Sequence, residues 1–390
     1  MEDYETILIG KIEELISKCW NCNFCFSTCP INQSMRGFMT NGPSGITQSI
    51  YYAIKWNLFD DKVANNELLN ILYSCTTCNS CVITCKEMSA GVSILDIIES
   101  GRKLLVEKMI GPPTTQKKVL ESLAKFGNPY SQHPTKRRQW LKDEKVKFLP
   151  EDSAEVLLFI GCTPSFDPDL HNMARAVFNL LKVANVDFGI LKNEVCCGHP
   201  ALKIGDEFLF YELRSKNIDQ IAESGAKKIV TISPHCFNTF TKYYQNDLQI
   251  EILHYTQFLF ELLQSQKIEL SKALTAKITY HDPCYLSKHS EIWDEPRKII
   301  QHIPNVKYQE MPRNRKNSFC CGGGGGRMWL EVEEEEKMEK LRVREAKMIG
   351  ADIIAVACPW CYTMLKTAIQ EEKTNIEIKD IAELILNLVF

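Results

Sequence analysis

The sequence has no run of about 18 apolar residues, the length at which a segment is read as a membrane-spanning helix. It has no basic, apolar leader either, because three of its first five residues are acids. We therefore expect a cytoplasmic protein that does not span a membrane. A formal net charge of −3 gives no electrostatic reason to bind nucleic acid. Flavin and nucleotide fingerprints are also missing, so a partner has to supply the electrons for any redox reaction.

Cysteine, by contrast, is abundant, with 17 in 390 residues. In a cytoplasmic chain such thiols stay reduced, and they bind metal more often than they form disulfides. Thiolates are soft ligands that suit iron and zinc. The length predicts two or three domains, and the 45% apolar content is enough to build a core in each. We therefore expect a metalloprotein of an anaerobic organism.

Two cysteine runs near the start share one spacing, Cys19-x2-Cys22-x2-Cys25-x3-Cys29 and Cys75-x2-Cys78-x2-Cys81-x3-Cys85. This spacing is typical of paired ferredoxin-type [4Fe-4S] cubanes, in which the fourth cysteine of each run ligates the other cluster. Zinc also uses C-x2-C pairs, but a third cysteine at another x2 step favours a cubane. We assign four cysteines to each cubane: Cys19, Cys22, Cys25 and Cys85 to the first, and Cys75, Cys78, Cys81 and Cys29 to the second. Helical periodicity over 5–18 and 94–108 predicts a helix near each end of residues 1–110, which hold both runs.

Three more cysteine groups lie towards the end of the chain, at Cys284, Cys320-Cys321 and Cys358-Pro359-Trp360-Cys361. Five glycines follow the cysteine pair, and we expect Gly322, Gly323 and Gly324 to let main chain approach a bulky inorganic cluster without Cβ collisions. This spacing resembles the CCG-domain family, which includes the disulfide-reducing subunit of heterodisulfide reductase. The resemblance implies that the five cysteines hold one noncubane [4Fe-4S] cluster, whereas a cubane needs only four.

The second part of the chain is an internal repeat with an offset of about 120 residues. Cysteines Cys162, Cys196, Cys197 and Cys236 match the positions of Cys284, Cys320, Cys321 and Cys358. Strand-like and helix-like runs alternate in both copies, which predicts an α/β domain made of two pseudo-symmetric, Rossmann-like CCG repeats over 153–273 and 274–390. A linker over 111–152 joins them to the helical ferredoxin domain. Cysteines at the carboxyl ends of strands should place both sites on one rim.

The first repeat is incomplete, because Thr239 stands where the second repeat has Cys361. Its four cysteines could hold a second noncubane cluster, a zinc ion, or nothing. An empty or altered site is our first expectation.

Four residues near these sites are candidates for catalysis. His199 and His281 could hand a proton to a departing thiolate, as could His235, because histidine titrates near neutrality. Arg327 could bind an anionic substrate. Each can equally be structural. The basic run 136–138 is either a docking patch for an acidic partner or, as we favour, a solvated linker.

The resemblance implies an iron–sulfur subunit of a multi-subunit oxidoreductase. Electrons from a flavin- or haem-containing partner would pass through two cubanes to the noncubane cluster, which reduces a disulfide or relays them. The alternative is a purely electron-transferring subunit of a flavoprotein dehydrogenase, or of an aromatic-ring or sulfur reductase complex, without a substrate site. Such a subunit can dock to a membrane protein without spanning the membrane. The partner, the thiol or disulfide substrate and the direction of electron flow stay open.

Overall fold

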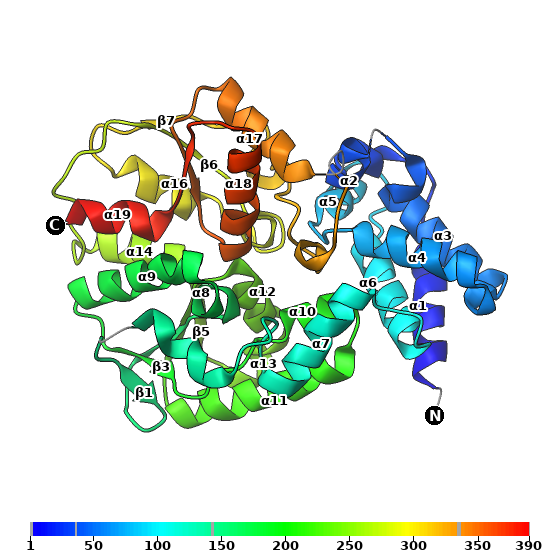
Figure 1. Ribbon diagram of the computed structural model, residues 1–390, viewed down its shortest axis with the longest axis horizontal. Coiled ribbons are helices and arrows are strands. Elements are labelled where there is room, and N and C mark those ends of the chain that lie inside the picture. The colour runs from blue at the N-terminus through cyan, green and yellow to red at the C-terminus, as the bar shows by residue number, and fades with distance from the viewer. Residues whose placement is uncertain (1–2, 36, 142–143, 334–336, 390) are drawn as a thin grey trace.

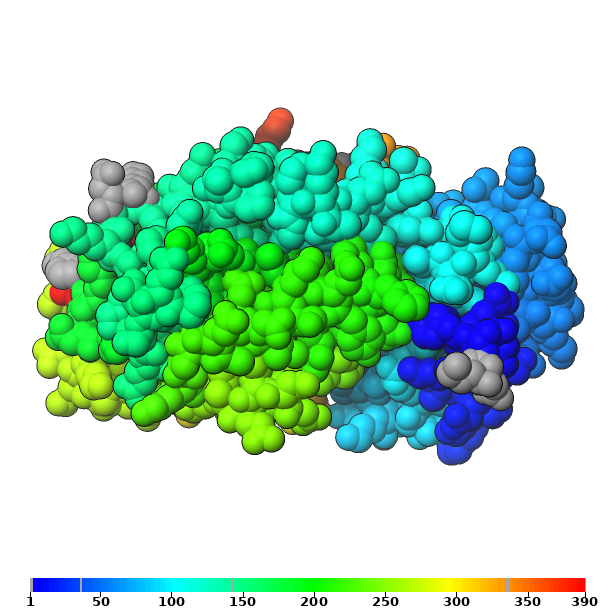
Figure 2. All heavy atoms as spheres, turned by 90° about the horizontal axis from the view of Figure 1, so that it is seen from below, coloured from blue at the N-terminus to red at the C-terminus, as the bar shows by residue number. Residues whose placement is uncertain are grey.

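The computed structural model describes residues 3–35, 37–141, 144–333 and 337–389. Figure 1 shows an all-helical N-terminal module beside two α/β halves, which lie one above the other. Seen from below in Figure 2, the first half and the residues before it cover most of the underside, and the N-terminal module forms one end. Among the described residues, no helix combines the length and apolar content that crossing a bilayer requires.

Six helices build the N-terminal module: α1 (Tyr4–Ser17), α2 (Pro30–Ser34), α3 (Pro43–Lys55), α4 (Lys62–Ser74), α5 (Ser80–Met88) and α6 (Ile94–Glu107). The 3-10 turns η1 (Phe24–Phe26), η2 (Met39–Asn41) and η3 (Leu58–Asp60) lie between them. Asp3 and Asp61 cap α1 and α4 by accepting hydrogen bonds from backbone N–H groups of the first turn. α6 is the central helix, because α1, α3 and α4 all pack on it. The helices predicted over 5–18 and 94–108 are confirmed.

The stretch 111–152, predicted to be a linker, carries structure of its own. It contains α7 (Thr114–Phe126), the 3-10 helix η4 (Pro134–Leu141) and the strand β1 (Lys147–Leu149). β1 pairs in parallel with β3 (Phe188–Leu191), so the first sheet takes its edge strand from this stretch. α7 buries Val119, Leu120 and Leu123 and packs on the first half.

The first half is a five-stranded parallel sheet in the order β1-β3-β2-β4-β5. Its further strands are β2 (Val156–Phe159), β4 (Lys228–Thr231) and β5 (Glu251–His254). Its helices are α8 (Cys162–Phe166), α9 (His171–Val183), α10 (His199–Ile204), α11 (Glu207–Ser224), α12 (Pro234–Tyr243), α13 (Gln245–Leu248) and α14 (Tyr255–Gln264), with the 3-10 turn η5 (Pro168–Leu170). β2 and β3 are buried along their whole length, as strands covered by helices on both faces must be.

The second half repeats this plan with four parallel strands in the order β7-β6-β8-β9. They are β6 (Lys277–Tyr280), β7 (Lys307–Tyr308), β8 (Ile353–Val356) and β9 (Glu377–Asp380). Its helices are α15 (Cys284–Ser287), α16 (Asp294–Gln301), α17 (Met338–Met348), α18 (Pro359–Glu371) and α19 (Ile381–Val389), with the turns η6 (Arg315–Asn317) and η7 (Arg327–Trp329). The predicted fold class, a helical module with two α/β repeats, is confirmed.

The last helix of each half packs against the other half, as Figure 1 shows. α14 of the first half lies on α16 of the second, and α19 of the second lies on α9 of the first. The buried Tyr255 hydroxyl donates to Asp380 Oδ2 across this interface at 2.6 Å. Because each half packs its last helix on the other, the two halves form one body.

Candidate metal centres

The first of two cysteine-lined cavities in the helical module lies near the surface. It is lined by Cys19, Cys22, Cys25 and Cys85, so the fourth cysteine comes from the second run. Cys22 is exposed and Cys19 half-buried, whereas Cys25 and Cys85 are buried. The backbone N–H of Val92 donates to Cys85 Sγ at 3.2 Å. Four thiols around one hollow are the donor set that a cubane needs.

The second cavity lies deeper and is lined by Cys29, Cys75, Cys78 and Cys81. The loop that carries Cys75 and Cys78 bends sharply, with left-handed backbone at Thr77 and Asn79. Burial raises the pKa of the Cys75 thiol to about 11. A bound cation is therefore needed to keep this thiol as a thiolate at neutral pH, and the irons of a cluster would supply that charge.

The five cysteines of the second half converge where its strands end. Cys284 follows β6, Cys358 follows β8 and caps α18, and Cys361 lies in the first turn of α18. All five, including Cys320 and Cys321, are buried. The sulfurs of Cys321 and Cys361 lie 3.3 Å apart.

This third cysteine group is in direct contact with the second cavity. Cys29 and Cys78 pack in one buried cluster with Cys284 and Cys320. Cys320 Sγ also lies 3.5 Å from the hydroxyl of Thr76, in the loop of the second cavity. Cysteines of the two sites therefore pack in one buried cluster.

His281 lies beside the third group, with a ring nitrogen within 4.8 Å of the sulfurs of Cys321 and Cys361. Arg342 Nε donates to its Nδ1 at 3.1 Å. Since arginine has only donors, Nδ1 must accept, and a neutral ring then carries its hydrogen on Nε2. Burial lowers the pKa of His281 to about 3, which keeps the ring neutral. Nε2 has no hydrogen-bond partner among the described residues, so His281 offers a buried N–H near the sulfurs, and its neutral ring argues against an acid–base role.

The glycine run lies very close to protein backbone in the loop of the second cavity. A Cβ on Gly324 would lie 2.3 Å from the carbonyl oxygen of Thr76, and one on Gly325 would lie 2.4 Å from that of Cys75. Gly322 and Gly323 have side chains of α17 and α18 as their nearest neighbours. The run therefore lets the second half dock on the loop of the second cavity.

In the first half, Cys162, Cys196, Cys197 and Cys236 are all buried. Arg137 Nη2 donates to Cys162 Sγ at 3.3 Å, and its Nη1 pairs with Glu194 at 2.7 Å. Both side chains are buried. The middle residue of the basic run 136–138 is thus neither a docking patch nor solvated, because its charge is used inside the first half.

Thr239, which replaces the fifth cysteine, closes a ring of hydrogen bonds with two histidines. Its hydroxyl donates to the carbonyl of His235 at 2.7 Å and lies 3.2 Å from His199 Nδ1. The other nitrogen of His199 lies 2.9 Å from His235 Nδ1. Both nitrogens of His199 are therefore occupied, and burial lowers the pKa of this histidine.

Aromatic rings fill the space between the two cysteine sites of the α/β halves. The ring centroids of His235 and Trp360 are 4.0 Å apart, and Tyr285 lies within 4.7 Å of His199 and His235. The indole N–H of Trp360 donates to the hydroxyl of Thr163, next to Cys162, at 2.9 Å. Trp360 thus joins the cysteine loops of the two halves.

Two buried arginines complete the surroundings. Arg327 lies in η7, and its charge opposes the rise that burial causes in the pKa of Glu339. Arg102, which sequence reasoning missed, is fully buried in α6. Its guanidinium donates to four backbone carbonyls, those of Leu72 (2.7 Å), Cys75 (2.6 Å), Lys203 (2.7 Å) and Gly325 (2.9 Å). These carbonyls belong to all three parts of the molecule. The sequence of α6 gives no signal for this, because Arg102 is one of several charged residues in the helix.

Comparisons with known families agree with this geometry. The model of a cysteine-rich domain matches residues 156–241 and 278–366, and that of a 4Fe-4S dicluster domain matches residues 15–88. The two repeat matches cover β2 to β4 of the first sheet and, from Ile278, β6 to β8 of the second, and the dicluster match contains all eight cysteines of the two cavities. The helical module is therefore a two-cubane domain.

Several known proteins resemble the chain along most of its length. A subunit of the dihydromethanophenazine:CoB–CoM heterodisulfide reductase of Methanosarcina barkeri is 31% identical over 98% of this chain and 96% of its own. The probable iron–sulfur-binding oxidoreductase FadF of Bacillus subtilis is 33% identical over 88% of this chain. The EtfAB:quinone oxidoreductase of Syntrophomonas wolfei is 31% identical over 80% of it. The chain spans about half the length of the last two relatives (50% and 46%).

Proposed function

Because the chain belongs to the family of cysteine-rich (CCG) iron–sulfur oxidoreductases that includes this heterodisulfide reductase protein, we propose that it is the electron-carrying subunit of a larger oxidoreductase. Electrons would cross two cubanes and reach a noncubane [4Fe-4S] cluster held by Cys284, Cys320, Cys321, Cys358 and Cys361. The observation that carries the proposal is the contact between cysteines of the second cavity and cysteines of this group. When bound, the clusters accept and release single electrons.

The three cysteine groups lie in a series that runs inward from solvent. Cys22 of the first cavity is exposed, three of the four cysteines of the second are buried, and all five of the third are buried. The protein thus leaves one cluster within reach of a partner and shields the other two from water.

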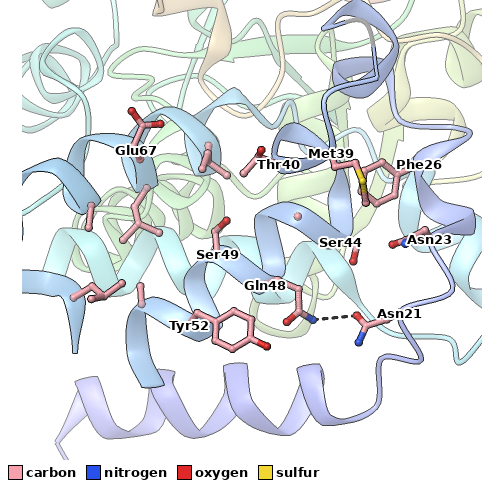
Figure 3. A pocket seen from close by; sticks show the side chains of 16 residues that line it. Asn21, Asn23, Phe26, Met39, Thr40, Ser44, Gln48, Ser49, Tyr52 and Glu67 are labelled. Carbon is pink, nitrogen blue, oxygen red and sulfur yellow. Dashed lines mark hydrogen bonds between the residues drawn. The ribbon is translucent and has the colours of Figure 1, made fainter. Parts of the chain in front are cut away.

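A flavin- or haem-containing partner would dock beside the first cavity. A groove there, shown in Figure 3, is lined by α3 and α4 together with Asn21, Phe26 and Met39. Trp20, next to Cys19, is 73% exposed, and Met39 is 63% exposed. Large apolar side chains of this kind are enriched at protein interfaces. Their position beside the first cavity, where Cys22 is exposed, supports an electron-transfer contact here.

The last step is either disulfide reduction or onward relay. The complete five-cysteine group supports reduction of a thiol-derived disulfide. Trp360 and its neighbours support the second candidate, a purely electron-transferring subunit, because they fill the space between the two cysteine sites. The hydrogen bonds that link Thr239, His199 and His235 further distinguish the first site from the second.

An anaerobic iron count with EPR of the oxidised protein tests the proposal. We expect about 12 irons per chain, from three four-iron clusters, and about 16 if the first half also holds one. Replacing Cys361 by serine should lower the count to about 8 and keep both cubane signals. The matching change in the first half, Cys236→Ser, should leave about 12.

About 8 irons in the wild type, or no loss in the Cys361→Ser variant, would contradict the noncubane assignment. Added thiols separate the two candidates for the last step. A new EPR signal with a thiol would show substrate sulfur at the third group, and unchanged spectra with every thiol would favour the relay.

A further inference from the structure

Two buried cations bond to the two ends of the loop of the second cubane cavity, which runs from Cys75 to Ser80. Arg102 is fully buried and donates to the carbonyl of Cys75 at 2.6 Å. Lys288 is 4% exposed, and its ammonium donates to Ser80 Oγ at 2.7 Å and to the carbonyl of Ser318. Ser80 lies between two cysteines of the cavity and lines it.

Neither charge is neutralised by a carboxylate within the described residues. The hydrogen bonds of Arg102 all end on carbonyl oxygens, and those of Lys288 end on a hydroxyl and a carbonyl. The buried carboxylate of Glu99 lies nearby, but it is paired with Lys203 at 2.6 Å. The described surroundings of the second cavity therefore include two buried cations that are not paired with a carboxylate.

The two cavities differ in the charged groups that bond to their walls. Arg102 bonds to Cys75 and Lys288 bonds to Ser80, both residues that line the second cavity. The described residues that line the first cavity include neither lysine nor arginine. The two buried cations therefore favour negative charge at the second cavity more than at the first.

We infer that Arg102 and Lys288 make the second cubane the better electron acceptor of the two, so that electrons entering at the exposed first cubane move inward. Reduction adds one negative charge to a cluster, and a nearby fixed cation in a medium of low dielectric constant stabilises that charge. Charges and hydrogen bonds around the sulfurs are the means by which a protein sets such a potential. This inference rests on the proposed function and gives it a direction.

Solvent acts in the opposite sense at the first cubane. Water around the exposed Cys22 also stabilises a reduced cluster, so burial alone would leave the second cubane the poorer acceptor. The inference therefore requires the two cations to outweigh this difference. Both the wild-type order and the effect of removing a cation have to be measured.

The test is a redox titration of the full iron-loaded chain, followed by EPR under anaerobic conditions. Cys22→Ser, which alters the first cubane, identifies its signal. Lys288→Gln removes a charge but keeps hydrogen-bond donors for Ser80 and Ser318. The matched control is Lys316→Gln, since Lys316 is half-exposed and paired with Glu87 at the surface. A second variant, Arg102→Gln, removes the other charge.

We expect the wild-type second cubane to titrate at the higher potential. Lys288→Gln should lower that midpoint and leave the first cubane unchanged, while Lys316→Gln should shift neither. A second cubane at or below the potential of the first, or a midpoint that ignores Lys288→Gln in a fully loaded chain, would overturn the inference. Failure to find two cubane signals in the wild type would instead contradict the proposed function.

Discussion

Replacing Gly324 by alanine should break the contact between the second half and the helical module. The new Cβ would lie 2.3 Å from the carbonyl oxygen of Thr76, whereas Cβ atoms in proteins keep about 3 Å from other heavy atoms. One backbone has to move by roughly 1 Å. The loop cannot easily retreat, because Arg102 holds the carbonyl of Cys75 and the hydroxyl of Thr77 lies 2.8 Å from that of Tyr285.

The cost follows from the contacts that the shift disturbs. Overpacking of a tight contact costs about 1–3 kcal/mol, and a stretched buried hydrogen bond at Arg102 adds about 1 kcal/mol. We expect a loss of about 3 kcal/mol in the free energy of unfolding. With a urea dependence of about 3 kcal/mol per molar, the unfolding midpoint should fall by about 1 M.

Urea unfolding of the iron-loaded protein, followed by circular dichroism, measures this loss. The control is Gly10→Ala, because Gly10 lies in α1 with no atom within 4 Å of its added Cβ. Alanine is the better helix former, so this variant should gain about 1 kcal/mol. The reasoning is refuted if Gly324→Ala unfolds at the wild-type midpoint or above it.

Three more changes test other parts of the molecule. Arg137→Met should cost about 3–5 kcal/mol in urea unfolding, because it leaves the buried Glu194 unpaired, and adding Glu194→Gln should recover part of the loss; equal losses in both variants would refute the pairing. Burial raises the pKa of Asp380, so its contribution to stability is complete at acid pH and is lost as pH rises through that raised pKa. Asp380→Asn should therefore be more stable than wild type at pH 8, with a gap that closes towards pH 4 in pH-dependent unfolding; a constant gap would argue otherwise. Thr239→Cys restores a fifth thiol and should raise the iron count from about 12 to about 16, whereas an unchanged count would mean that more than this residue disables the first site.

The cysteine spacing was enough to predict the fold class and the grouping of the metal-site candidates. Cysteine spacing reports local structure. Both the spacing of a ligand run and the strand before a cysteine can be recognised from residues that are neighbours in the sequence. Arg102 could not be predicted in the same way, because its partners are backbone carbonyls from three distant parts of the chain. Within the run 136–138, Arg137 was misread for the same reason, since it pairs with Glu194 only in the folded protein, whereas Lys136 is exposed as predicted. The glycine run signalled a close approach but could not say to what.

The hydrogen bonds of Arg102 also impose an order on assembly. During synthesis of the chain, Leu72 and Cys75 are added before Arg102, but Gly325 is added 223 residues after it. Until the second half has folded and docked, the guanidinium lacks its bond to Gly325, and the loop of the second cavity has no glycine run against it. We therefore expect a chain whose second half has not yet docked to leave this side of the second cavity uncovered. We also expect a cluster to enter most easily at that stage, because the docked second half packs against the loop of the cavity.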